Sequence, residues 1–184
     1  MKPVVVLVVA LALTLAGCTS GEPEVEPAAT PDGWQRHEFP GGTVAAPADW
    51  TLDPVDEGDD LTLQGPAPDG GLPPIARFRV DERDGVPFDG LLQTAAAQLT
   101  LQFGDVQPGD VTDLDLDGAE SAEAGTFRYQ ADVDGTPVDI EERIAVAWFG
   151  EDRQLQVRIG SPADQAAELD DTLQQILDSI TFGA

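Results

Sequence analysis

The chain has 184 residues, of which 35 are aspartate or glutamate and nine are lysine or arginine, so its formal net charge at pH 7 is −26. A surface this acidic repels nucleic acids and anionic lipid headgroups, which excludes a role in binding nucleic acid. Cys18 is the only cysteine and His37 the only histidine, so an intrachain disulfide and a zinc site built from several histidines are also excluded.

The first 18 residues predict an export signal followed by a lipid attachment site. Lys2 supplies a basic start, and the apolar run 4–13 is too short to span a bilayer comfortably, which disfavours a transmembrane anchor. The sequence Leu15-Ala16-Gly17-Cys18 then resembles the lipobox of bacterial lipoproteins, in which the cysteine thiol is acylated, for example with palmitate, and becomes the new N-terminus. We therefore expect residues 1–17 to be a signal peptide and Cys18 to be the lipidated residue.

Residues 18–33 predict a flexible tether that begins at the acylated Cys18. This segment is rich in Pro, Glu, Thr and Gly and has almost no side chains to bury. The remaining residues, 34–184, are enough for one domain with its own core. We expect this domain to be held at the extracytoplasmic face of the cell membrane by the lipid, because the charge of the mature chain repels the membrane surface.

Short strands and one helix are predicted in the first half of the domain. Between residues 34 and 64, Pro and Gly turns separate the strand-like pieces WQRHEF, TVAA, WTL and LTLQ. Residues 75–80 alternate apolar and charged side chains like a half-buried strand. Residues 88–103 change to a helical period, and Gly104 supplies a stop signal.

Three long strands and a final helix are predicted in the second half. The strands are centred on residues 127–133, 140–148 and 155–159, with Glu142 out of the apolar pattern and Asp134-Gly135 as a hairpin turn. Ser161-Pro162 has the chemistry of a helix N-cap followed by proline. The buried stripe of the final helix is predicted to be Leu169, Leu173, Ile176, Leu177 and Ile180. Together these elements predict an α+β fold, an antiparallel β-sheet covered by two main helices.

The order of these elements is similar to that of a known family. The sequences Phe39-Pro40 and Ala46-Pro47-Ala48-Asp49-Trp50, the Asp-Gly-linked meander and the terminal segment Ile176–Phe182 resemble the LpqN-type lipoproteins of actinobacteria and the wider PsbP-like fold. The likeness spans residues 34–182 and lies in the pattern of elements more than in any one motif. It implies a PsbP-like α/β sandwich and a non-catalytic accessory or binding protein.

The acidic sequence from Asp113 to Gly118 begins like a calcium-binding loop. A calcium-binding helix-loop-helix site also needs a bidentate glutamate at position 12, where this chain has Ala124, and it needs flanking helices. The flanking residues alternate like strands, so Asp117-Gly118 predicts a β-turn with Asp113 and Asp115 in solvent. We expect no metal site here.

The arginines carry the strongest hint of a binding surface. Five of them lie inside predicted strands and are expected on the sheet face opposite the helices: Arg77, Arg79, Arg128, Arg143 and Arg158. One interpretation is that they form cross-strand ion pairs, with Glu141, Glu142, Asp132 and Asp139 as partners. The other is that they form a concave patch for an anionic ligand or partner.

The leading functional hypothesis is a lipid-anchored, non-catalytic binding or scaffold protein that contacts another protein of the cell envelope and is itself monomeric. The alternative is a carrier that binds a small amphiphile or lipid between helix and sheet, although arginines on the outer sheet face disfavour it. A carboxylate-dependent hydrolase is a distant third. A triad hydrolase would need His37 beside Ser121, Ser161 or Ser179, none of which lies in a nucleophile turn, and no cofactor-binding motif occurs.

Overall fold

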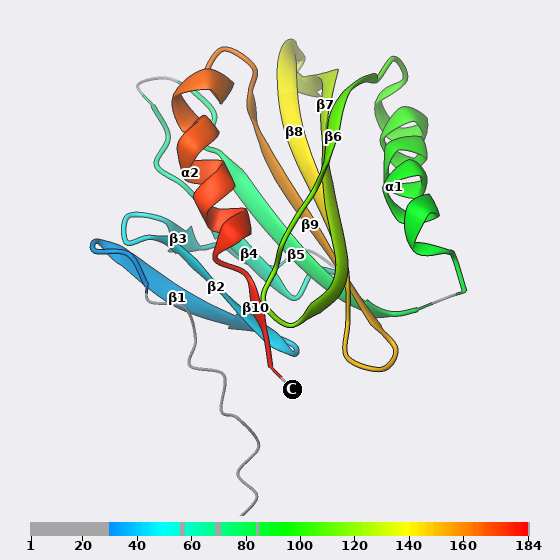
Figure 1. Ribbon diagram of the computed structural model, residues 1–184. Helices are drawn as coiled ribbons and strands as arrows, with labels where there is room; N and C mark the ends of the chain where they lie inside the picture. The colour runs from blue at the N-terminus through cyan, green and yellow to red at the C-terminus, as the bar shows by residue number, and fades with distance from the viewer. Residues whose placement is uncertain (1–29, 56–57, 69–70, 84, 184) are drawn as a thin grey trace, which may run out of the picture.

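The fold is seen in a computed structural model that describes residues 30–183 except 56–57, 69–70 and 84. The predicted signal peptide, Cys18 and all but the last residues of the tether lie outside the described residues. The described part contains a large and a small antiparallel sheet and two α-helices (Figure 1). The mixed α+β fold predicted from the sequence is therefore confirmed.

The large sheet has seven strands in the order β3-β4-β5-β9-β8-β7-β6. Its strands are β3 (Thr51–Leu52), β4 (Leu61–Gln64), β5 (Ile75–Glu82), β6 (Gln107–Asp113), β7 (Ala119–Val133), β8 (Thr136–Phe149) and β9 (Arg153–Pro162). The predicted hairpin turn joins β7 to β8, with Asp134 at φ 52° and Gly135 at φ 81°. Two consecutive positive φ angles are typical of the two-residue turn that matches strand twist.

The small sheet has the order β1-β2-β10 and consists of β1 (Trp34–Phe39), β2 (Gly42–Pro47) and β10 (Thr181–Phe182). It joins the two ends of the described chain, because β10 pairs with β2. Gly118 lies in the turn between β6 and β7, at φ 79°, and the N–H of Ala119 donates to the carbonyl of Leu116 at 3.0 Å. The β-turn predicted at Asp117-Gly118 is therefore present.

The two helices lie on opposite faces of the large sheet, as Figure 1 shows. Helix α1 (Phe88–Phe103) packs in one apolar cluster with Ile144, whereas α2 (Ala166–Asp178) belongs to the cluster that contains Ala145. Neighbouring residues of a strand point to opposite faces, so the two clusters occupy the two sides of β8. The expectation that one face would lie opposite both helices was wrong, because an apolar stripe does not encode which sheet face it covers.

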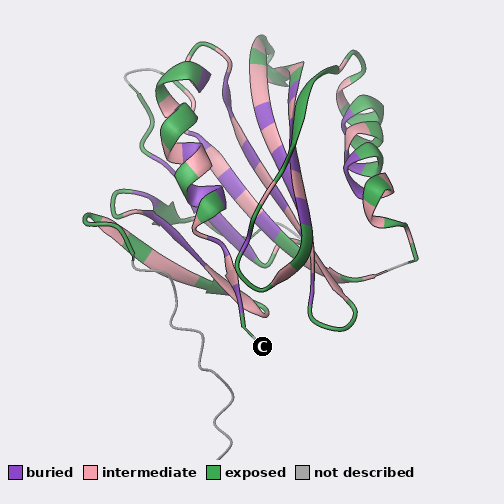
Figure 2. Ribbon diagram, viewed as in Figure 1, coloured by how far each residue is buried: buried purple, intermediate pink, exposed green. Residues whose placement is uncertain are grey.

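The larger core lies between α2, the small sheet and the large sheet, and it contains fully buried side chains such as Val44, Phe78, Phe149 and Ile176. The smaller core lies under α1 (Figure 2). Helix α1 has the predicted bounds, and Gly104 ends it at φ 87° with its N–H bonded to the carbonyl of Thr100 at 2.9 Å.

The start of α2 differs from the prediction. Ser161 and Pro162 end strand β9, where they pair with Glu141 and Ile140, and the helix begins at Ala166 without a side-chain cap. A proline at the end of a strand costs little stability, because few ladder hydrogen bonds are lost there. Pairing with the long strand β8 therefore keeps this segment extended. Ile180 also lies beyond the helix, although it is fully buried.

Candidate functional site

The face of the large sheet that carries α1 is divided into a covered and an open half. Over β7 and β8, α1 buries Phe127, Ile144 and Val146. Over β5 and β9, polar side chains replace the apolar ones: Arg77, Arg79, Asp81, Gln154, Gln156 and Arg158. Strand register places all six on this face, because Arg77 pairs with Arg158, Arg79 with Gln156 and Asp81 with Gln154. We call it the α1-side face.

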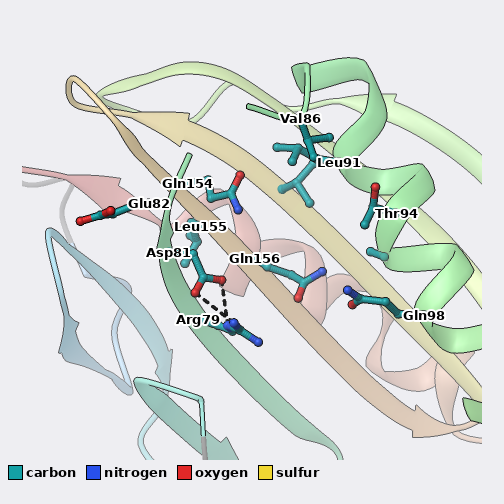
Figure 3. Close-up of a pocket in the computed structure, with 12 residues that line it drawn as sticks. Arg79, Asp81, Glu82, Val86, Leu91, Thr94, Gln98, Gln154, Leu155 and Gln156 are labelled. Carbon is teal, nitrogen blue, oxygen red and sulfur yellow. Dashed lines mark hydrogen bonds and ion pairs between the residues drawn. The ribbon is translucent and has the colours of Figure 1, made fainter. Parts of the chain in front are cut away.

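A groove of about 310 Å³ runs along the boundary between the two halves. The helix contributes Thr94 and Gln98 to its wall, and β9 contributes Gln154 and Gln156 (Figure 3). Its apolar base is formed by Val86, Leu91, Ala95 and Val146. We call this cavity the α1 groove. Its volume is at the lower end of the range for ligand-binding pockets.

The polar groups of the α1 groove differ in whether they are satisfied. Thr94 donates its hydroxyl to the carbonyl of Gly90 at 2.8 Å. The side-chain oxygen of Gln154 is buried and has no hydrogen-bond partner among the described residues. A buried acceptor without a donor carries a desolvation cost. This oxygen has almost no accessible surface, so a bound donor can satisfy it only after the Gln154 side chain rotates.

The arginine at the mouth of the groove is paired within the chain, while Glu82 adds a further carboxylate to the lining. The Nε of Arg79 lies 2.7 Å from the carboxylate of Asp81, two residues along the same strand and on the same face. Dashed lines in Figure 3 mark this pair. Both side chains are largely exposed, so the pair contributes little stability. It leaves the groove lined mainly by carboxamides and aliphatic groups.

A buried charged cluster lies on the same face, formed by Tyr129, Glu142 and Arg158. Glu142 is 2% exposed and accepts hydrogen bonds from Arg158 Nε at 2.6 Å, from Arg158 Nη2 at 3.0 Å and from the Tyr129 hydroxyl at 2.8 Å. Burial, followed by the charge of Glu142, raises the pKa of Tyr129 well above its usual value. Glu142, which breaks the apolar pattern of β8, is thus a satisfied structural carboxylate.

The other two predicted arginines, Arg128 and Arg143, lie on the opposite face of the large sheet, which carries α2 and which we call the α2-side face. Arg128 pairs with Glu141, its direct cross-strand partner, at 2.6 Å. Arg143 forms an ion pair with Asp170 of α2 and is largely buried beneath it. A second cavity of about 340 Å³ lies beside these pairs at strand β6. The prediction that the five arginines gather on one face was wrong, because residues alternate between the faces along each strand and the register between strands decides which face each arginine occupies.

Each of the five arginines has a carboxylate partner. Glu141 and Glu142 were predicted partners, whereas Asp59, Asp81 and Asp170 come from loops, from the same strand and from α2. Asp132 instead accepts a hydrogen bond from the N–H of Gly135, and Asp139 accepts one from Gln130. Whether any of these arginines contacts a partner stays a prediction.

No pattern in the sequence marks Gln98, Gln154 or Gln156 as site residues. Glutamine on the polar side of a strand or helix is an ordinary surface residue, and only the position of α1 over the neighbouring strands brings the three together. The alternation of β9 does predict that Gln154 and Gln156 share a face. It cannot predict that a helix flanks them.

The residues considered for catalysis and metal binding lie apart from the groove. His37 is in β1, its Nε2 is buried without a partner in the described part of the chain, and burial lowers its pKa. Ser179 donates to the carbonyl of Ile176 at 2.7 Å and accepts from the N–H of Ala45 at 2.9 Å. Among the described residues, no group of three or more His, Cys, Asp or Glu side chains is placed to hold a metal ion.

The acidic turn around Asp113 has its carboxylates in solvent and its leucines directed inward, with Leu116 buried. Glu123 of the neighbouring strand lies near Asp113 and Asp89, and burial and then these two charges raise its pKa. The described helices include none that is long and apolar enough to cross a membrane.

No known protein family matches the sequence, and no characterised protein is significantly similar to it. Solved structures do match. LpqN from Mycobacterium tuberculosis, described as involved in cell envelope biogenesis, is 19% identical with a TM-score of 0.57, over 82% of this chain and 91% of that one. The Ran-binding protein Mog1p from Saccharomyces cerevisiae is 13% identical with a TM-score of 0.59, over 81% of this chain and 95% of that one. Cyanobacterial PsbP from Synechocystis is 14% identical with a TM-score of 0.49, over 85% and 96%.

These comparisons show a common fold. The chain shares the architecture of LpqN and Mog1p across about four-fifths of its length, so the LpqN-type fold implied by the sequence resemblance is confirmed. Identities below 20% show no common activity, since one fold hosts many functions.

Proposed function

We propose that this chain is a lipid-anchored binding protein of the cell envelope that contacts another envelope protein through the α1 groove and does no chemistry of its own. The observation that carries the proposal is the groove itself, a cavity beside α1 into which uncharged polar side chains from a helix and a strand converge. Surface cavities with a few convergent polar groups are the usual places for recognition.

The proposed anchor is the lipid on Cys18. It is supported by the apolar run that precedes this cysteine, by the tether that follows it, and by the fold shared with an envelope protein. Stable attachment needs more than one acyl chain, as bacterial lipoproteins usually have. Cys18→Ala should leave the protein unmodified by labelled palmitate and free of the membrane. A Cys18→Ala protein that stays with membranes after a high-salt wash would contradict the anchor.

The acidic surface suits a partner with a basic surface around the contact site. Complementary charge speeds association and makes its rate sensitive to salt, while the contacts in the groove determine how long the complex lasts. We expect the association rate to fall several-fold between low and physiological ionic strength, with a smaller change in the dissociation rate.

The carrier alternative receives less support from the geometry. A small amphiphile needs an apolar pocket, and the cavity between helix and sheet is walled by three glutamines, a threonine and an ion pair. The interface under α1 is otherwise occupied by the side chains of the smaller core.

Site-specific photo-crosslinking in intact cells tests the proposal. A photoreactive residue at Gln98, in the groove, should form an adduct with a discrete envelope protein. The matched control is Gln93, which is exposed on the same helix and points away from the sheet. Equal adducts from both positions, or none from Gln98, would show that the groove is not the contact site.

A further inference from the structure

Three carboxamides meet in the α1 groove, from two different elements. Gln98 projects from α1, and Gln154 and Gln156 project from β9, across the groove from it (Figure 3). Each carboxamide has both a donor and an acceptor, as does each peptide group of an extended backbone. Side chains of this kind can therefore bind both the N–H and the C=O of a peptide that lies along the groove.

The unsatisfied acceptor of Gln154 matches the need of a peptide N–H for a hydrogen-bond acceptor. The buried side-chain oxygen of Gln154 lacks a donor in the described part of the chain. A backbone N–H is a donor that an extended segment presents at regular intervals. Because this oxygen has almost no accessible surface, Gln154 must rotate to present it to a bound N–H. The new hydrogen bond would then satisfy an acceptor that is unpaired in the free protein.

The dimensions fit a short extended segment. The groove follows α1 from Leu91 to Gln98, which are seven residues apart and therefore span about 10 Å of helix. Three residues of extended chain cover about the same distance, at about 3.3 Å each. The base formed by Leu91, Ala95 and Val146 offers contact to a small apolar side chain of the middle residue.

The chemistry of the lining selects between classes of ligand. Arg79 and Asp81 at the mouth neutralise each other, and Glu82 adds one carboxylate to the lining, so the groove disfavours an anionic ligand. None of the described residues that line the groove is aromatic, so this lining lacks the flat surface on which a sugar ring stacks. The polar walls equally oppose a lipid chain.

We propose that the α1 groove binds an uncharged, extended segment of about three residues of the partner protein, reading its backbone through Gln98, Gln154 and Gln156. This inference rests on the proposed function and specifies the partner's binding element. The groove recognises peptide groups by hydrogen bonds and admits a small apolar side chain at its base. The acidic surface outside the groove contacts basic residues that flank the segment.

The test uses peptides selected on the full-length protein in mild detergent from a phage-displayed library of random 12-residue peptides. Selected peptides should share a short uncharged core. Gln154→Leu and Gln156→Leu should each weaken their binding about tenfold, whereas Gln93→Leu, on the solvent face of α1, should leave it unchanged. Thermal unfolding of each variant shows whether it is folded.

A second measurement does not depend on protein variants. N-methylation of the central residue of a selected peptide removes one backbone N–H and keeps every side chain, and it should also weaken binding about tenfold. Selected peptides that bind Gln154→Leu and wild type equally, or that tolerate N-methylation at every core position, would overturn the proposal. So would displacement of the peptide by neutral oligosaccharides such as maltotriose or chitotriose.

The two proposals can fail separately. If photo-crosslinking from Gln98 yields a protein adduct while peptide binding ignores the glutamines, the groove contacts a protein through other chemistry and only the peptide inference is wrong. If no adduct forms from Gln98 in cells and no peptide is selected, the proposed contact site is wrong as well.

Discussion

Two ion pairs on opposite faces of the large sheet join the same kinds of side chain in different surroundings. On the α2-side face, Arg128 contacts Glu141 at 2.6 Å, with 69% of the arginine side chain and 12% of the glutamate side chain exposed. On the α1-side face, Arg158 contacts Glu142 at the same distance, but the two side chains are 30% and 2% exposed, and Glu142 also accepts from Tyr129. Distance is equal in the two pairs, so burial is the variable that separates them.

The comparison teaches that an arginine–carboxylate pair in this acidic protein has two different roles. The exposed pair is screened by water and salt, and its contribution to stability is small. The buried pair has lost its water, so each partner depends on the other to remain charged in the interior. The following predictions test that difference.

The largest effect is expected from Glu142→Gln. Loss of the carboxylate leaves Arg158 without its counter-charge in a mostly buried position, which should lower the free energy of unfolding by about 3 kcal/mol. Urea denaturation followed by tryptophan fluorescence measures the loss, since Trp50 lies in the larger core.

Replacing the whole cluster by apolar residues distinguishes two causes of instability, a buried charge left without its partner and the loss of the ion pair itself. Glu142→Leu with Arg158→Met and Tyr129→Phe removes the whole cluster and leaves no buried group unpaired, so it should recover most of the stability lost in Glu142→Gln. If the triple variant is as unstable as Glu142→Gln, the cost comes from packing and not from an orphaned charge.

The sequence predicts much of the fold because periodicity is a local signal. Helix α1 has the predicted bounds, β1 and β4 coincide with the predicted strands, and the Asp134-Gly135 turn joins β7 to β8. Ser161-Pro162 was misassigned because the same two residues suit a helix N-cap and the end of a strand. Which one forms depends on the length of β8, a partner distant in sequence.

The site was predictable only in part, for the same reason. Glu142 was identifiable as an exception in an apolar strand, but its partners Arg158 and Tyr129 come from two neighbouring strands whose register the sequence does not specify. The α1 groove depends on the position of a helix over part of a sheet. Nothing near Gln154 in the sequence encodes that position.

The next prediction concerns the pH dependence of stability that the buried pair causes. The folded-state pKa of Tyr129 is raised, so its contribution to stability is fully present below the unfolded value of about 10 and is lost as pH rises above it. Stability should therefore fall above pH 10, at a limiting slope of about 1.4 kcal/mol per pH unit.

Few other side chains titrate near pH 10 in this protein, because Tyr129 is the only tyrosine and Lys2 the only lysine. Tyrosinate absorbance near 295 nm reports the single phenol directly. We expect it to appear together with unfolding and not before it. A phenol that titrates near pH 10 in the folded protein would show that water reaches the cluster freely.

A smaller loss is expected from Tyr129→Phe. The substitution removes the hydroxyl that donates to Glu142 at 2.8 Å and keeps the ring, which stacks on Phe103 with centroids 4.2 Å apart. Arg158 still bonds both carboxylate oxygens, so the cost should be about 1.5 kcal/mol, typical of one hydrogen bond to a charged group. The variant should also lose the steep fall in stability above pH 10, and retention of that fall would assign it to another group.

The smallest effect is expected from Arg128→Gln, which breaks the exposed pair. The guanidinium is largely in solvent, and its removal should let water reach Glu141, whose side chain is 12% exposed in the intact pair. Stability should therefore fall by about 0.5 kcal/mol at low salt. Because the Debye length shortens to about 3 Å at 1 M salt, the difference from wild type should vanish there, whereas the loss in Glu142→Gln should persist. Urea denaturation of both variants at 0.05 M and 1 M sodium chloride makes the measurement. If Arg128→Gln destabilises the protein as much as Glu142→Gln does, at either salt concentration, burial is not what distinguishes the two pairs.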